Sequence, residues 1–119
     1  MFYLDNCQRI WLYTRPTDMR KSFNGLTGII HGQLNSNAQS GDWFVFVNRR
    51  KTHIKVLYFD GSGFCIWFKR LEQGQFNFRP SAEEKKPLNF AGLQLLLAGI
   101  EVQKYRQYKR LSRASRAQF

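Results

Sequence analysis

The sequence is short of cysteine, of acidic residues and of long apolar runs. Its two cysteines, Cys7 and Cys65, lie far apart with no pairing pattern, which favours a reduced, cytoplasmic protein over a disulfide-stabilised one. The longest apolar runs, such as Leu95–Ala98, are far below the roughly 20 residues that span a bilayer. The first residues also lack the basic and then apolar pattern of a signal peptide. We therefore expect no membrane-spanning segment and no membrane partner.

Residues that could form a catalytic or metal site are equally sparse. His31, His53 and the two cysteines show none of the paired spacings typical of zinc ligands. Among the 8 acidic residues, Asp18 is a candidate helix cap and Asp60 a candidate turn residue, both of which are structural roles. The glycines of Gly61-Ser62-Gly63 join two predicted strands instead of opening a helix, so they do not predict a phosphate-binding loop. The sequence thus predicts no catalytic residues, no metal site and no cofactor.

What the chain does have is apolar residues and positive charge. Hydrophobic residues make up 43% of the 119, which is enough for a folded core. The 19 lysines and arginines exceed the acidic residues by 11, and the excess runs through both halves of the chain. A field of this sign favours phosphate-rich partners or an anionic surface.

The apolar patterns predict one α+β domain. Residues 1–101 are expected to hold an antiparallel β-meander of three to five strands with two main helices, and residues 102–119 to be a basic C-terminal helix or tail. The expected elements are a strand over 8–14, a helix over 23–34, strands over 43–47, 54–59 and 64–68, and a helix over 88–100. Residues 73–78 are read as a short strand or irregular edge, and 79–87 as a charged linker.

The strand over 54–59 is apolar on both faces. Ile54, Val56 and Tyr58 alternate on one face, and Leu57 shares the other with Lys55. A sheet with two apolar faces predicts helices, or a partner, on both sides.

Basic and aromatic residues alternate through the centre of the chain. Asn48, Arg49, Arg50 and Lys51 occupy a predicted hairpin turn without a neighbouring acid, so this turn is predicted to contact phosphates. Aromatic rings lie between the basic residues, and they are interpreted as core in preference to a base-stacking surface. These rings are Trp43, Phe44, Phe46, Tyr58, Phe59, Trp67 and Phe68.

The segment 104–116 contains basic residues and no acid. On a helix, Arg106, Lys109, Arg110, Arg113 and Arg116 would share about a third of the circumference. The pattern leaves open whether the segment is a basic helix or a tail.

Short motifs spread over roughly residues 8–101 resemble a known family. In chain order they are Thr17-Asp18-Met19-Arg20-Lys21, Gly25-Leu26, Gly41, Phe44-Val45-Phe46, Asn48-Arg49-Arg50, Ile54-Lys55, Leu57, Asp60-Gly61, Gly63-Phe64, Lys69-Arg70-Leu71-Glu72, Gly74-Gln75-Phe76 and the Leu-rich, Gly-ended segment 93–100. Together they are similar to the accessory protein encoded by the second reading frame of the IS-sixty-six class of bacterial insertion sequences.

The resemblance implies a protein needed for transposition beside a separate transposase that carries the catalysis, and it supplies no catalytic residues. Combined with the charge, it predicts a non-catalytic accessory factor that binds DNA through a basic surface. The candidate contacts are Arg20, Lys21, Asn48, Arg49, Arg50, Lys51, Lys55, Lys69, Arg70, Arg106, Lys109, Arg110 and Arg113. Two alternatives stay open: a subunit that docks on the transposase without touching DNA, and a small metal-dependent nuclease.

Overall fold

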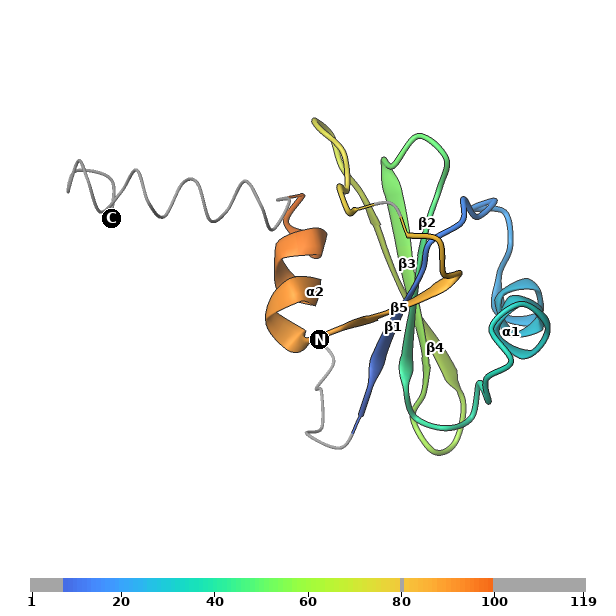
Figure 1. The fold of residues 1–119 in the computed structure, drawn as a ribbon. Coiled ribbons are helices and arrows are strands. Elements are labelled where there is room, and N and C mark those ends of the chain that lie inside the picture. The colour runs from blue at the N-terminus through green and yellow to red at the C-terminus, as the bar shows by residue number, and fades with distance from the viewer. Residues whose placement is uncertain (1–7, 80, 100–119) are drawn as a thin grey trace.

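The computed structural model describes residues 8–79 and 81–99, which form a sheet with a helix on each face (Figure 1). The strands are β1 (Ile10–Tyr13), β2 (Trp43–Val47), β3 (His53–Phe59), β4 (Phe64–Arg70) and β5 (Lys85–Leu88), and the helices are α1 (Phe23–Gly32) and α2 (Phe90–Leu97). The sheet order is β4-β3-β2-β1-β5. The predicted α+β class is confirmed.

The predicted meander forms as expected. β2 pairs antiparallel with β3, and β3 pairs antiparallel with β4. The turn from β3 to β4 is held by Asp60, whose Oδ1 accepts hydrogen bonds from the backbone N–H groups of Ser62 and Gly63 at 2.9 Å. Gly61 lies between Asp60 and Ser62 at φ 104°, a left-handed conformation that glycine adopts without a Cβ clash.

The remaining two strands make the sheet mixed, which the sequence patterns did not predict. β1 lies parallel to β2 with Ile10 opposite Trp43, and parallel neighbours require a long crossover connection, which α1 provides. β5 pairs antiparallel with the outer edge of β1. The interpretation of 79–87 as a linker was therefore wrong for Lys85–Pro87, because their backbone completes this edge despite their charge.

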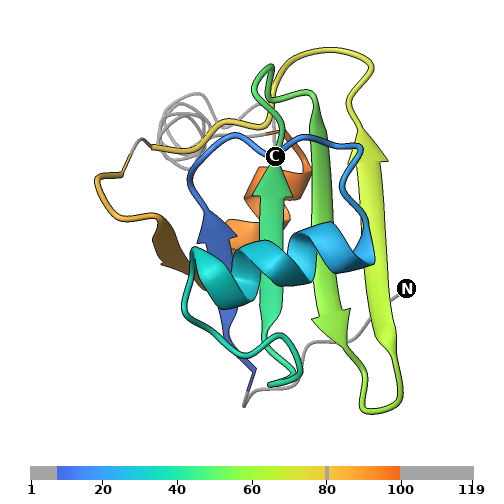
Figure 2. The same cartoon turned by 90° about the vertical axis from the view of Figure 1, so that its right-hand side faces the viewer.

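The two faces of the sheet carry separate cores, each covered by one helix (Figures 1 and 2). Leu93 and Leu96 of α2 pack against one face, and Leu26 and Ile30 of α1 pack against the other. β2 is buried along its whole length because both helices cover it. The prediction of helices on both faces is confirmed.

The helix ends differ from the predicted caps. α1 begins after Ser22, and Asp18 instead bonds the backbone N–H of Arg20 in the preceding turn. A Cβ at Gly25 would lie 2.9 Å from the Cβ of Lys21, so the first turn of the helix needs glycine where the Lys21 side chain packs against it. α2 is capped by Asn89, whose Oδ1 accepts from the N–H of Gly92.

Candidate nucleic-acid interface

The register of the sheet brings most of the predicted cations to one end. β1 and β2 are parallel, so both end at the same side, where the N–H of Thr17 donates to the carbonyl of Val47 at 2.9 Å. β4 also ends there, with Arg70 opposite His53. The segment 14–22, the β2–β3 turn and the segment after β4 therefore lie together, at the top of Figures 1 and 2. We call this the basic end; the predicted contacts in it are Arg20, Lys21, Arg49, Arg50, Lys51, Lys69 and Arg70, and Arg15, 4.0 Å from Glu84, lies there as well.

Asn48 shapes the β2–β3 turn instead of pointing outward. Its Oδ1 accepts from the backbone N–H groups of Thr52 at 2.9 Å and His53 at 3.0 Å, and its Nδ2 donates to the Thr52 hydroxyl. These side-chain bonds add to the backbone bonds of the turn, in which the N–H of Asn48 donates to the carbonyl of His53 at 3.1 Å. The structure gives Asn48 a positioning role beneath the two arginines that follow it.

Arg49 and Arg50 are exposed at the tip of this turn, and within the described part of the chain neither guanidinium has a partner. Their backbone is held: the Arg50 carbonyl accepts from Gln75 Nε2 at 2.9 Å, and the Lys51 carbonyl accepts from the N–H of Phe76 at 2.7 Å. The turn therefore holds two unneutralised cations on an anchored backbone.

Lys51 is half-buried beside them. Its backbone has φ 60°, and its Nζ lies 4.6 Å from the centroid of the Phe78 ring. The ammonium thus remains without an acidic partner among the described residues, although the ring partly orients it.

Arg20 and Arg70 are neutralised locally. Arg20 Nη2 lies 2.7 Å from Asp18 Oδ2, and Arg70 Nη2 lies 3.1 Å from Glu72 Oε1. Both pairs are largely exposed, so a phosphate can compete with either carboxylate. As candidate phosphate contacts, Arg20 and Arg70 therefore rank below the cations that have no acidic partner.

Hydrogen bonds from the Arg20 guanidinium, and then from the Arg20 backbone N–H, lower the pKa of Asp18 to about 2. We predict that Asp18 titrates near this value in the folded protein and returns toward its ordinary value in Arg20→Gln, measured by NMR of the carboxyl carbon. A lowered pKa means that the pair's contribution to stability is present above pH about 4 and is lost as pH falls toward 2. An Asp18 pKa unchanged by Arg20→Gln would contradict this account.

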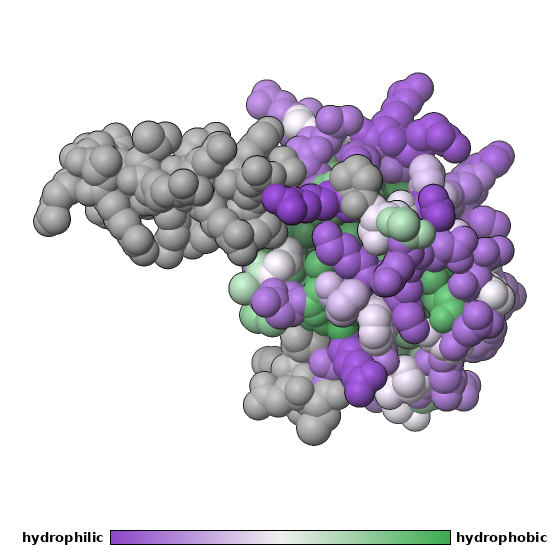
Figure 3. Space-filling model, in the orientation of Figure 1, coloured by the Kyte–Doolittle hydropathy of each residue, from purple (hydrophilic) through white to green (hydrophobic). Residues whose placement is uncertain are grey.

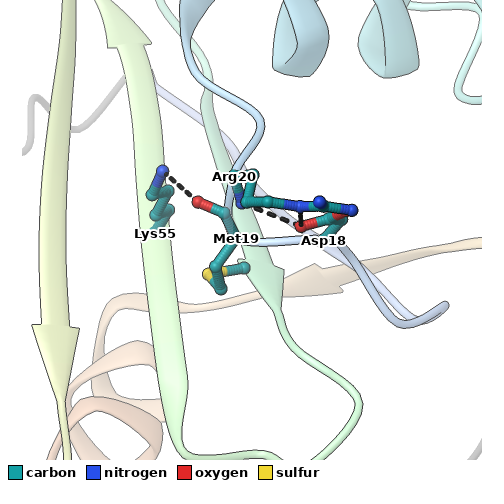
Figure 4. Close-up of polar contacts among 4 residues, drawn as sticks. All are labelled: Asp18, Met19, Arg20 and Lys55. Carbon is teal, nitrogen blue, oxygen red and sulfur yellow. Dashed lines mark hydrogen bonds and ion pairs between the residues drawn. The ribbon is translucent and has the colours of Figure 1, made fainter.

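Lys55 and Lys69 use their ammonium groups to bond backbone carbonyls within the fold. Lys55 is 8% exposed, and its Nζ donates to the carbonyl of Met19 at 2.9 Å (Figure 4). It also donates to the carbonyl of Lys21 at 2.8 Å. Lys69 Nζ donates to the carbonyl of Leu97 at 2.8 Å, at the C-terminus of α2, where a cation is favoured by the helix dipole. Each lysine ties a segment outside the sheet to a strand.

Lys21 remains exposed while its carbonyl is bonded by Lys55. Among the described residues, the cations at the basic end that bond neither a carboxylate nor a backbone carbonyl through their side chains are thus Lys21, Arg49, Arg50 and Lys51. Figure 3 shows hydrophilic side chains covering this end of the molecule. The candidates Arg106, Lys109, Arg110 and Arg113 lie outside the described residues.

The aromatic residues divide between core and surface. Trp43, Phe44 and Phe46 are fully buried, as predicted. Phe68 is 53% exposed, which departs from the interpretation of this ring as core. It lies on the edge strand β4, and the sequence patterns did not indicate which strand would be at the edge.

The described residues contain no group of three or more His, Cys, Asp or Glu side chains arranged to hold a metal ion. Both histidines serve local structure: His31 Nε2 accepts from the N–H of Ala38 at 3.2 Å, and His53 Nδ1 lies 2.8 Å from the Thr52 hydroxyl. Over the same residues, no helix is long and apolar enough to cross a membrane.

Comparison with known proteins identifies the family. The model of the IS66 Orf2-like proteins matches residues 8–107. The chain belongs to this family, whose members are accessory proteins associated with transposition. This confirms the resemblance inferred from the motifs.

Two curated relatives come from Sinorhizobium fredii (strain NBRC 101917 / NGR234). The uncharacterized protein y4hO is 39% identical over 94 residues, covering 78% of this chain and 81% of the relative. The uncharacterized protein y4jC is 34% identical over 93 residues, covering 78% and 80%. No solved structure matches the chain.

Proposed function

We propose that this IS66 Orf2-like protein is a cytoplasmic, non-catalytic accessory factor that binds DNA through the basic end while the element's transposase carries out the chemistry. One observation supports the contact most directly: Lys21, Arg49, Arg50 and Lys51, from two separate segments, meet at one end of the sheet without acidic partners among the described residues. Cations on an anchored backbone suit phosphate contacts, because little conformational freedom is lost when they bind.

We predict that the purified protein binds duplex DNA with little sequence preference and strong salt dependence. Four phosphate contacts give a slope of about −3 to −4 for log affinity against log salt concentration. A fluorescence anisotropy titration of a labelled duplex over several salt concentrations measures this slope, and the DNA should remain uncut on a gel in the presence of Mg²⁺.

Absence of binding at low salt, or a slope near zero, would contradict DNA contact. Binding that appears only with purified transposase would instead support the docking alternative. Cleavage that requires Mg²⁺ would support the nuclease alternative.

A further inference from the structure

Phe68 is a large apolar side chain that the fold leaves in water. It is 53% exposed in the middle of an edge strand, on the face of the sheet that α1 covers. Its ring has defined polar neighbours on β3, the side chains of Lys55 and His53.

Two side chains hold the Phe68 ring from β3. Lys55 Nζ lies 4.9 Å from the ring centroid, and the His53 ring lies 5.8 Å away with an interplanar angle of 32°. Lys55 is itself fixed by the carbonyls of Met19 and Lys21, and His53 by the β2–β3 turn. The Phe68 ring is therefore oriented before any ligand arrives, and a ligand that stacks on it loses little side-chain entropy.

Cations surround this ring. Lys55 donates to the carbonyl of Lys21, so the exposed Lys21 belongs to the segment directly beside Phe68. Arg70 follows two residues later on the same face of β4. Its register partner on β3 is His53, whose backbone N–H donates to the Asn48 side chain at the base of the Arg49–Arg50 turn. The ring thus lies beside Lys21 and Arg70, and His53 connects this region to the turn that carries Arg49 and Arg50.

A flat apolar ring among cations fits one class of ligand best. Single-stranded nucleic acids present base faces for stacking and phosphates for ion pairing, whereas the bases of an intact duplex are already stacked on one another. We propose that Phe68 is a stacking platform for an unpaired base, so that the protein prefers DNA with an open or single-stranded segment. This inference rests on the proposed DNA binding and specifies the form of DNA that is bound.

The test compares a short oligothymidylate with a duplex of the same length, at one salt concentration, for the parent and three variants. We expect the parent to bind the oligothymidylate more tightly than the duplex. Phe68→Ala should weaken single-strand binding by roughly 5- to 160-fold, the equivalent of ~1–3 kcal/mol of stacking per base, and change duplex binding by less than about twofold. Phe68→Trp should retain the preference because it keeps a stacking ring.

Phe90→Ala is the matched control, since Phe90 is 48% exposed but belongs to α2 on the opposite face. It should leave both affinities unchanged. The proposal is overturned if Phe68→Ala leaves the preference intact, or if it weakens both DNA forms equally. If the proposed DNA binding itself fails, the parent protein binds neither form of DNA, so that result is distinct from a failure of the stacking proposal.

Discussion

Lys55→Met is expected to lower the free energy of unfolding by about 1–3 kcal/mol while leaving the affinity of the folded protein for duplex DNA unchanged. Methionine fills a similar volume but cannot donate to the carbonyls of Met19 and Lys21, which would lose their charge-assisted partner. The measurement is urea unfolding followed by DNA binding at a temperature where the variant is folded. This result would mean that Lys55, which the sequence predicted as a DNA contact, instead stabilises the segment that carries Lys21.

Lys21→Met is the matched control, since it removes an equal charge from a neighbouring exposed position. It should change stability by no more than about 0.5 kcal/mol and should weaken DNA binding. If Lys55→Met instead weakened DNA binding at unchanged stability, the ammonium would reach DNA directly and its place in the fold would be secondary.

The second large effect is expected from the double variant Arg49→Ser, Arg50→Ser. Losing two phosphate contacts should flatten the salt slope by about 1.8 and weaken binding by tens of fold near 0.1 M salt. Thermal stability should be nearly unchanged, because the turn is held through backbone carbonyls and Asn48, which the substitutions leave in place. Anisotropy titrations and a melting curve measure both outcomes.

A double variant that removes two positive charges elsewhere distinguishes phosphate contacts at the turn from the effect of the protein's net charge. Arg9 precedes β1 at the opposite end of the sheet, and Lys86 lies within β5. Arg9→Ser, Lys86→Ser should change the slope much less than the turn variant. Equal effects of the two doubles would mean that net charge, and not the basic end, determines affinity.

The elements that the sequence predicted correctly are those specified by neighbours in the chain. Short apolar runs over 43–68 with turn residues between them were sufficient for the meander, and apolar spacing was sufficient for both helices. The parallel pairing of Ile10 with Trp43 depends on residues far apart in sequence, so no local pattern reported it. For the same reason Lys85–Leu88, whose composition is that of a linker, was not recognised as a strand.

In the candidate site, too, the sequence predicted what depends on chain neighbours and missed what depends on distant residues. The turn position of Arg49 and Arg50 could be read from the sequence, because a basic run between two strands must lie at a hairpin tip. Lys55 was grouped with them by charge, although its position on the same strand face as Leu57 was a signal of burial. The exposure of Phe68 could not be inferred, since it follows from β4 being the outermost strand.

The contact between Lys69 and the last turn of α2 has a consequence for the Arg49–Arg50 turn. It holds the end of that helix against the segment after β4, where a Cβ added at Gly99 would lie 3.4 Å from Leu71 and 3.7 Å from the Gln75 carbonyl. The Gln75 side chain in turn bonds the Arg50 carbonyl, so the end of α2 and the turn are joined through one segment. We expect a nucleic acid that touches both of them to bind with greater avidity than either contact alone would give.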